Sequence, residues 1–193
     1  ILSSLLSAMS DTSCVLLLCR HGETDYNVRG ILQGQRDTTL NKVGEAQAVA
    51  LGIALYGVFS QDGGSSPLAS TAYASDLQRA ARTARIVLDQ IACGYDIAVA
   101  TDERLREKAL GPFEGLTEAQ AVMSLEREWE DFIVGREVTG VEKTEDVTRR
   151  AVDALTAICT KHKGETVLVV SHGGVIHSVI AKLFRGRVPP IGN

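Results

Sequence analysis

Short apolar runs alternate along the chain with longer stretches in which apolar residues recur every three or four positions. The short runs predict strands, at 15–19 (VLLLC), 71–75, 97–100 and 166–170 (TVLVV). The longer stretches predict helices, over 41–56, 76–91, 117–134, 144–162 and 173–184. Because strands alternate with helices, the pattern predicts an α/β fold, a three-layer α/β/α sandwich with a mostly parallel sheet.

The polar residues at the helix starts and the spacing of apolar residues add detail to two helices. Asn41 is the expected N-cap of the first, whose buried face is predicted to hold Ala46, Val49, Ala50 and Ile53. Asp76 is the expected cap of the second, whose buried stripe is predicted to hold Ala80, Ala84, Val87 and Ile91. Between these helices, the QDGGSSP stretch at 61–67 predicts a surface loop.

Composition narrows the class of protein. The chain has 193 residues, 45% of them apolar and 23% charged, with a net charge of −4. These values indicate one globular domain over 13–193, cut short at its C-terminus, after an extension at 1–12. The mild acidity gives no support to nucleic-acid or membrane partners, and no apolar run is long enough to span a bilayer. The oligomeric state is left open.

Cysteine usage and the N-terminus bear on the compartment. Four cysteines in a chain of this length are too sparse for a disulfide scaffold, and no CxxC or zinc-type spacing occurs. A reduced, cytoplasmic location is therefore expected. A plastid is the alternative if residues 1–8, ahead of Met9, are the remnant of a transit peptide rather than upstream carry-over.

Conspicuous polar residues follow the predicted strands. Arg20-His21-Gly22-Glu23-Thr24 follows the first, Arg79 lies just after the second, Glu107 after the third, and Ser171-His172-Gly173-Gly174 after the fourth. Parallel strands bring their carboxyl ends to one edge of the sheet, where ligands bind in such folds. Arginine forks bind phosphoryl oxygens, a neutral histidine nitrogen can attack phosphorus, and a carboxylic acid can protonate a leaving oxygen.

Each of these pieces alone also has a structural interpretation. Arg79 belongs to an arginine-rich helix of the kind that is usually solvated, and Glu107 lies among other charged residues. His162, between two lysines, is expected to be exposed at a helix C-terminus. His177 is expected to be a packed helix residue that could reach the pocket. The agreement of four motifs, not any single one, favours a phosphate site.

The motifs resemble those of the histidine phosphatase superfamily, also called phosphoglycerate mutase-like. Leu18–Thr24 matches its LxRHGET hallmark, and the second, third and fourth motifs are matched by Ser75–Ala80, Leu105–Glu107 and Val169–Gly174. Asn27 and Gln33-Gly34 match its substrate-facing loop. The likeness covers about 15–184 and looks closest to metal-independent phosphoserine phosphatases and broad-specificity phosphatases.

The resemblance implies a phosphatase that acts on small phosphomonoesters and needs no metal or other cofactor. His21 would be the nucleophile that becomes phosphohistidine, and Glu107 the proton donor. The phosphoryl oxygens would be held by Arg20, Arg79 and a cationic His172. Further substrate contacts are expected from Asn27, Gln33, Gly34 and Gly173.

Departures and rivals leave part of this open. The family's Gly-Gly-Glu-Ser stretch reads Gly140-Val141-Glu142-Lys143 here, so its serine is absent. A phosphoglycerate mutase is the nearest rival, but only the 64 residues 108–171 separate Glu107 from His172, without the basic insertion of true mutases. A non-catalytic phospholigand-binding scaffold is a further alternative. A tyrosine-phosphatase loop from Cys14 to Arg20 is disfavoured because the intervening residues predict a strand.

Overall fold

Four parallel strands form the centre of the computed structural model, which describes residues 13–59, 69–92, 94 and 96–184. They are β1 (Val15–Arg20), β2 (Thr71–Ala74), β3 (Val99–Thr101) and β4 (Thr166–Ser171). Their order across the sheet is β1-β4-β2-β3, and every pairing is parallel. The predicted α/β fold is confirmed, and each strand end lies within two residues of its predicted position.

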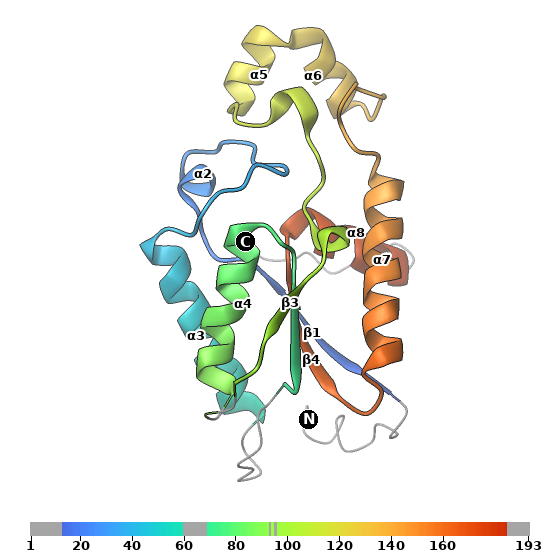
Figure 1. Cartoon of the computed structure of the whole chain (residues 1–193). Coiled ribbons are helices and arrows are strands. Elements are labelled where there is room, and N and C mark those ends of the chain that lie inside the picture. The colour runs from blue at the N-terminus through green and yellow to red at the C-terminus, as the bar shows by residue number, and fades with distance from the viewer. Residues whose placement is uncertain (1–12, 60–68, 93, 95, 185–193) are drawn as a thin grey trace.

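Helices cover both faces of this sheet (Figure 1). α3 (Lys42–Phe59) and α4 (Gln78–Ile91) pack on one face, and α7 (Thr144–Lys161) and α8 (Gly173–Leu183) pack on the other. The residues of β4 alternate between the two layers, with Leu168 and Val170 facing α3 and α4, and Val167 and Val169 facing α7 and α8. The sheet is therefore buried on both sides, as parallel sheets are.

A smaller helical unit extends beyond the carboxyl ends of the strands (Figure 1). It contains α5 (Glu118–Ser124) and α6 (Glu126–Ile133), and its core is aromatic, with the Phe113 and Trp129 rings edge to face at 5.3 Å. The prediction of one helix over 117–134 is wrong. The helix breaks at Leu125, whose φ of −140° and ψ of 44° are not helical.

The buried face of α3 is also not the predicted one. Asn41 caps this helix as expected, since its side chain accepts a hydrogen bond from the Gly44 amide at 2.8 Å. The predicted face is exposed instead, with Ile53 at 59% and Val49 at 36%. The helix is apolar on several sides, and its smallest residues face inward, where they allow close contact with the neighbouring layer: Gly44, Ala48 and Gly52.

α4 follows its predicted stripe but not its predicted cap. The four residues predicted to be buried are all fully buried: Ala80, Ala84, Val87 and Ile91. The N-cap is Leu77, without a side-chain hydrogen bond, because the Asp76 carboxylate forms an ion pair with Arg106. The predicted loop at 61–67 lies outside the described residues.

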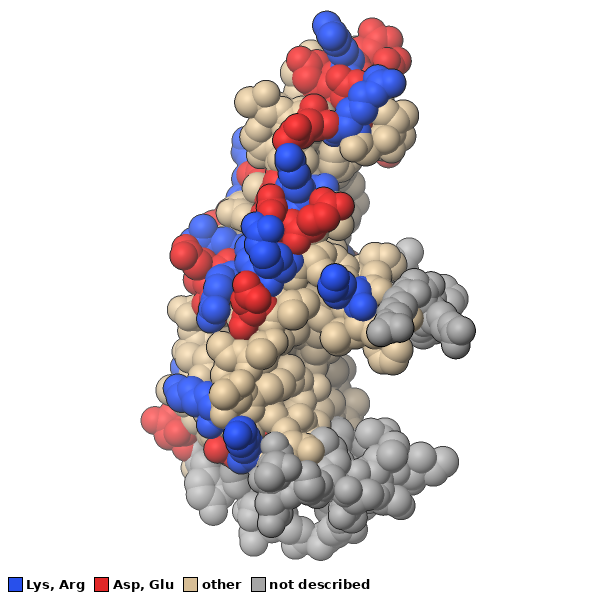
Figure 2. Space-filling view, turned by 90° about the vertical axis from the view of Figure 1, so that its right-hand side faces the viewer, with Lys and Arg blue, Asp and Glu red and all other residues tan. Residues whose placement is uncertain are grey.

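Short helical turns complete the described elements: α2 (Asp25–Val28), η2 (Glu103–Leu105) and η3 (Gly111–Phe113). Cys14, Cys19 and Cys159 are free thiols, and Cys93 lies outside the described residues. Across the part of the chain that the structure describes, no helix is long and apolar enough to cross a membrane. Basic and acidic side chains interleave over the upper half of the α7 face (Figure 2).

Candidate active site

Three neighbouring strands bring the predicted site residues together. Arg20 ends β1, and the amide of His21 donates to the Ser171 carbonyl of β4 at 3.0 Å. The Ser75 amide donates to the Val170 carbonyl at 2.9 Å, which places the start of α4 beside the same strand end. Thus residues 150 positions apart in sequence meet at one edge of the sheet, as the parallel arrangement requires.

Two histidines form the floor of the site. The rings of His21 and His172 lie 5.1 Å apart between centroids, with their planes at 60°. His21 is 8% exposed, and His172 is fully buried. His21 Nδ1 lies 2.7 Å from the Gly22 carbonyl oxygen. Because a carbonyl can only accept, the neutral ring carries its proton on Nδ1 and keeps a lone pair on Nε2.

A buried arginine lies beside these rings. Arg79, only 1% exposed, donates from Nη1 to the Arg36 carbonyl at 2.7 Å and from Nη2 to the Gly34 carbonyl at 2.9 Å. The solvated position that is usual for an arginine-rich helix does not apply to this residue. The sequence signal was its place in the first turn after a strand, which set it apart from Arg82, whose side chain is 55% exposed.

Three buried nitrogen atoms of the site have no hydrogen-bond partner among the described residues. They are Nε of Arg79 and both ring nitrogens of His172. Buried polar groups are nearly always paired, and leaving one unpaired costs about 1–3 kcal/mol. Their concentration at one point indicates a site built to receive an acceptor-rich ligand.

Burial keeps both rings neutral when only protein groups surround them. It lowers the pKa of His21 from 6.5 to about 4, against the hydrogen bond to Gly22, and the charges of Arg79 and Arg20 lower it further. Burial also lowers the pKa of His172 well below its ordinary value, followed by the positive charge of Arg79. A neutral His21 is the form that can act as a nucleophile.

Glu107 is held at the edge of this group by backbone amides. The Lys108 amide donates to Oε1 at 2.9 Å, and the Gly174 amide of α8 donates to Oε2 at 3.2 Å. A methyl group on Gly174 would lie 2.5 Å from Oε1, so a larger residue there would push the carboxyl group out of this position. The carboxyl group of Glu107 therefore lies against the first turn of α8, the helix that begins directly after His172.

The loop after β1 is held against α3 by a contact between two glycines. A Cβ atom on Gly22 would lie 2.3 Å from the Gly44 carbonyl oxygen, and one on Gly44 would lie 2.1 Å from the Glu23 carbonyl oxygen. The Gly22 amide also donates to Thr83 Oγ1 of α4 at 3.0 Å. Both helices of this layer therefore fix the residue that follows His21.

Of the residues predicted to contact substrate, Asn27 and Gln33 make hydrogen bonds within the loop after β1. Asn27 Oδ1 accepts from the Thr24 amide at 3.0 Å, and Gln33 Oε1 accepts from the Thr38 hydroxyl at 2.6 Å. Gly34 has a φ of +51°, which favours glycine, and its carbonyl anchors Arg79. Gly173 packs against the Arg20 side chain, where a Cβ atom would be 3.4 Å from Nε.

Two other histidines are not where the sequence indicated. His162 is 8% exposed, with Nε2 3.0 Å from the Tyr73 hydroxyl and Nδ1 3.2 Å from Glu165. The chain turns at Gly164, with φ of +77°, and the Glu165 amide donates to the His162 carbonyl at 3.2 Å, so the turn places Glu165 beside the ring. His177 is exposed rather than packed and lines a cavity of about 860 Å³ between α7 and α8.

Sequence reasoning missed a supporting pair, Arg150 and Glu142, behind Glu107. Arg150 donates to the Glu107 carbonyl at 3.0 Å and to both Glu142 oxygens. A signal was present, because Arg150 lies three residues after Val147 and four before Ala154, on the buried stripe of α7. A charged residue on such a stripe needs a partner.

The comparisons with known proteins agree with this geometry. Residues 16–190 match the sequence model of the histidine phosphatase superfamily (branch 1). A metal-independent phosphoserine phosphatase of Arabidopsis thaliana is 34% identical over 87% of this chain and 68% of its own length. A glucosyl-3-phosphoglycerate phosphatase of Mycobacterium tuberculosis is 34% identical over 88% of this chain and 75% of its own.

A solved structure shares the fold as well. Bacillus stearothermophilus YhfR superposes with a TM-score of 0.78 at 33% identity, over 92% of this chain and 85% of that one. The strand-end histidines, the buried arginine and the matching sequence motifs lead to one assignment. The chain belongs to the histidine phosphatase superfamily.

Proposed function

We propose that this phosphatase hydrolyses small phosphomonoesters through a phosphohistidine on His21. The observation that carries the proposal is the set of unpaired buried nitrogen atoms beside a neutral His21, namely Arg79 Nε and the two ring nitrogens of His172. A phosphoryl group offers three acceptor oxygens and a charge of about −1.5 to −2. Its oxygens can form the hydrogen bonds that these nitrogen atoms do not make within the described residues.

Charge balance accounts for binding without a metal ion. Arg20 and Arg79 provide two positive charges, and a bound phosphate would raise the pKa of the adjacent His172 and so favour its protonation. Two guanidinium groups and one imidazolium then more than offset the negative charge of the phosphoryl group. Phosphoryl transfer depends mainly on positioning and electrostatic stabilisation, which this group of residues provides.

The reaction then proceeds in two balanced steps. The lone pair of His21 Nε2 forms a bond to phosphorus as the ester P–O bond breaks, and Glu107 gives its proton to the departing oxygen. Water next attacks the phosphohistidine, Glu107 takes a proton from that water, and the N–P bond breaks to release phosphate. The hydrogen bond from Nδ1 to the Gly22 carbonyl holds the ring in the reactive tautomer throughout.

The names of the relatives indicate the class of substrate. Two phosphatases at 34% identity are named for phosphoserine and glucosyl-3-phosphoglycerate, both small phosphorylated metabolites. Hydrolysis is favoured over mutase chemistry because the segment between Glu107 and His172, residues 108–171, lacks the basic insertion of true mutases. A cytoplasmic location remains a prediction from cysteine usage.

Trapping the covalent intermediate tests the proposal. Wild-type protein mixed with phosphoserine labelled in its phosphoryl group and quenched in base should carry an acid-labile label, and His21→Ala should carry none and lose at least about 10³-fold in kcat/KM. Activity that survives His21→Ala, or strong inhibition by EDTA, would contradict the mechanism. Phosphoglycerate isomers formed faster than free phosphate would support the mutase alternative.

A further inference from the structure

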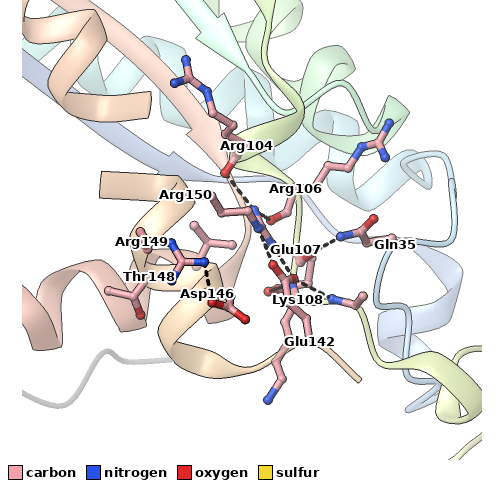
Figure 3. Close-up of polar contacts among 12 residues, drawn as sticks. Gln35, Arg104, Arg106, Glu107, Lys108, Glu142, Asp146, Thr148, Arg149 and Arg150 are labelled. Carbon is pink, nitrogen blue, oxygen red and sulfur yellow. Dashed lines mark hydrogen bonds and ion pairs between the residues drawn. The ribbon is translucent and has the colours of Figure 1, made fainter. Parts of the chain in front are cut away.

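Arg150 uses every nitrogen of its guanidinium group in contacts behind the site (Figure 3). Nη1 donates to the carbonyls of Arg104 at 2.8 Å and Arg106 at 2.6 Å, and Nη2 donates to the carbonyl of Glu107 at 3.0 Å. Nε and Nη2 also donate to the two carboxylate oxygens of Glu142 at 2.7 and 2.9 Å. One side chain of α7 therefore fixes three carbonyls of the segment that ends at Glu107.

Glu142 extends this attachment to the other side of Glu107. Its Oε2 accepts from the Ala109 amide at 3.2 Å, and its own amide donates to the Ala109 carbonyl at 2.9 Å. Burial acts to raise the pKa of Glu142, but hydrogen bonds from Arg150 and Ala109 hold it below its usual range. The carboxylate is thus charged at neutral pH and remains paired with Arg150.

The arrangement resembles a support for a reacting group rather than a surface ion pair. The side chains of Arg150 and Glu142 are only 18% and 19% exposed. On the opposite side of the segment, Gln35 donates to the Glu107 carbonyl at 3.1 Å. The backbone around Glu107 is therefore held from α7 and from the loop after β1, while two amides orient the carboxyl group itself.

The preceding residue of the same helix shows what an ordinary surface arginine looks like. Arg149 has a side chain that is 70% exposed, and its ion pair is with Asp146, one turn away. Figure 3 shows its guanidinium joined to Asp146, with no contact drawn to the Glu107 segment. Arg149 is therefore a matched control for substitutions of Arg150.

We propose that Arg150 is a positioning residue, which together with Glu142 holds Glu107 where it can protonate the leaving oxygen. This inference rests on the proposed function, in which Glu107 is the proton donor. Lysine cannot replace Arg150, because a single ammonium cannot reproduce a planar fork that contacts three carbonyls and a carboxylate. Misplacing an acid by about 1 Å can cost ~100-fold in rate.

The test compares two leaving groups. Nitrophenolate departs readily without a proton, whereas a serine alkoxide needs one. Arg150→Lys should therefore lower kcat/KM for phosphoserine by ~100-fold and for p-nitrophenyl phosphate by less than about 5-fold. Glu142→Gln should show the same split at about 10-fold, and Arg149→Lys should change neither substrate by more than about 2-fold.

Glu107→Gln separates the two proposals. If it shows the leaving-group split and Arg150→Lys instead slows both substrates equally, the role of Arg150 is wrong and that of Glu107 stands. If Glu107→Gln shows no split, the acid assignment in the proposed function fails, and the inference fails with it. Thermal unfolding checks each variant. Should Arg150→Lys not fold, Glu142→Gln decides the question by the same criterion.

Discussion

Buried histidines lie at both ends of the sheet, but their hydrogen bonding differs between the two ends. At the amino ends of the strands, His162 has both ring nitrogens near partners, the Tyr73 hydroxyl and the Glu165 carboxylate. At the carboxyl ends, His172 is more deeply buried, yet neither of its nitrogens has a partner among the described residues. Buried polar groups with hydrogen-bond partners stabilise a fold, whereas buried polar groups without them indicate a place where a ligand can bind.

Substitution of His172 is the most direct test of this difference between the two ends of the sheet. His172→Ala should lower kcat/KM by about 10³-fold, the loss typical of removing one donor to a transition-state oxygen. The stabilisation of the protein by added orthovanadate, measured as a rise in Tm, should fall in parallel. His172→Gln, which keeps a donor, should recover part of both. A variant without this ring that retained a tenth of the activity would make His172 structural, like His162.

Lowering the pH should destabilise the protein, because burial keeps the histidines at the carboxyl ends of the strands neutral. Well above pH 6.5, His21 is neutral in both the folded and the unfolded chain and contributes no pH dependence. Between pH 6.5 and about 4, only the unfolded chain binds the proton, so the free energy of unfolding should fall by up to about 3 kcal/mol as the pH is lowered.

Urea unfolding at a series of pH values measures this loss, with His21→Asn as the comparison. The variant should show a shallower fall over the same range, and His172, whose pKa burial also lowers, accounts for part of the remainder. Parallel curves for the two proteins would mean that His21 is not held neutral by burial.

The smallest effect is expected at the amino end. His162→Ala should reduce the free energy of unfolding by about 1–3 kcal/mol, because the Tyr73 hydroxyl loses a buried partner, while kcat/KM stays within about 2-fold of wild type. Lys163→Ala, at the exposed neighbouring position, should change stability by less than about 0.5 kcal/mol. A marked loss of activity in His162→Ala would show that the two ends of the sheet are coupled.

The sequence was sufficient to predict the sheet and the meeting of the motifs, because both follow from short-range patterns. Apolar runs mark parallel strands, and parallel strands bring His21, Arg79 and His172 to one edge whatever the details of packing. The catalytic roles of these residues remain predictions.

Packing choices could not be predicted in the same way. α3 is apolar on several sides, so the pattern alone does not say that Ala48 faces inward and Ile53 outward. The burial of His162 depends on a turn at Gly164 and on a tyrosine 89 residues away in sequence. The support of Glu107 by Arg150 likewise joins segments 43 residues apart, which no local pattern relates.

The glycine contact between the loop after β1 and α3 limits how this sequence can change. At both Gly22 and Gly44 the obstacle to a Cβ atom is main chain, at 2.3 and 2.1 Å. No substitution of a neighbouring side chain can make room, since backbone atoms cannot be shortened. Neither position can therefore be rescued by a compensating mutation, and libraries aimed at new substrates should leave both unchanged while varying the Asn27 and Gln33 loop.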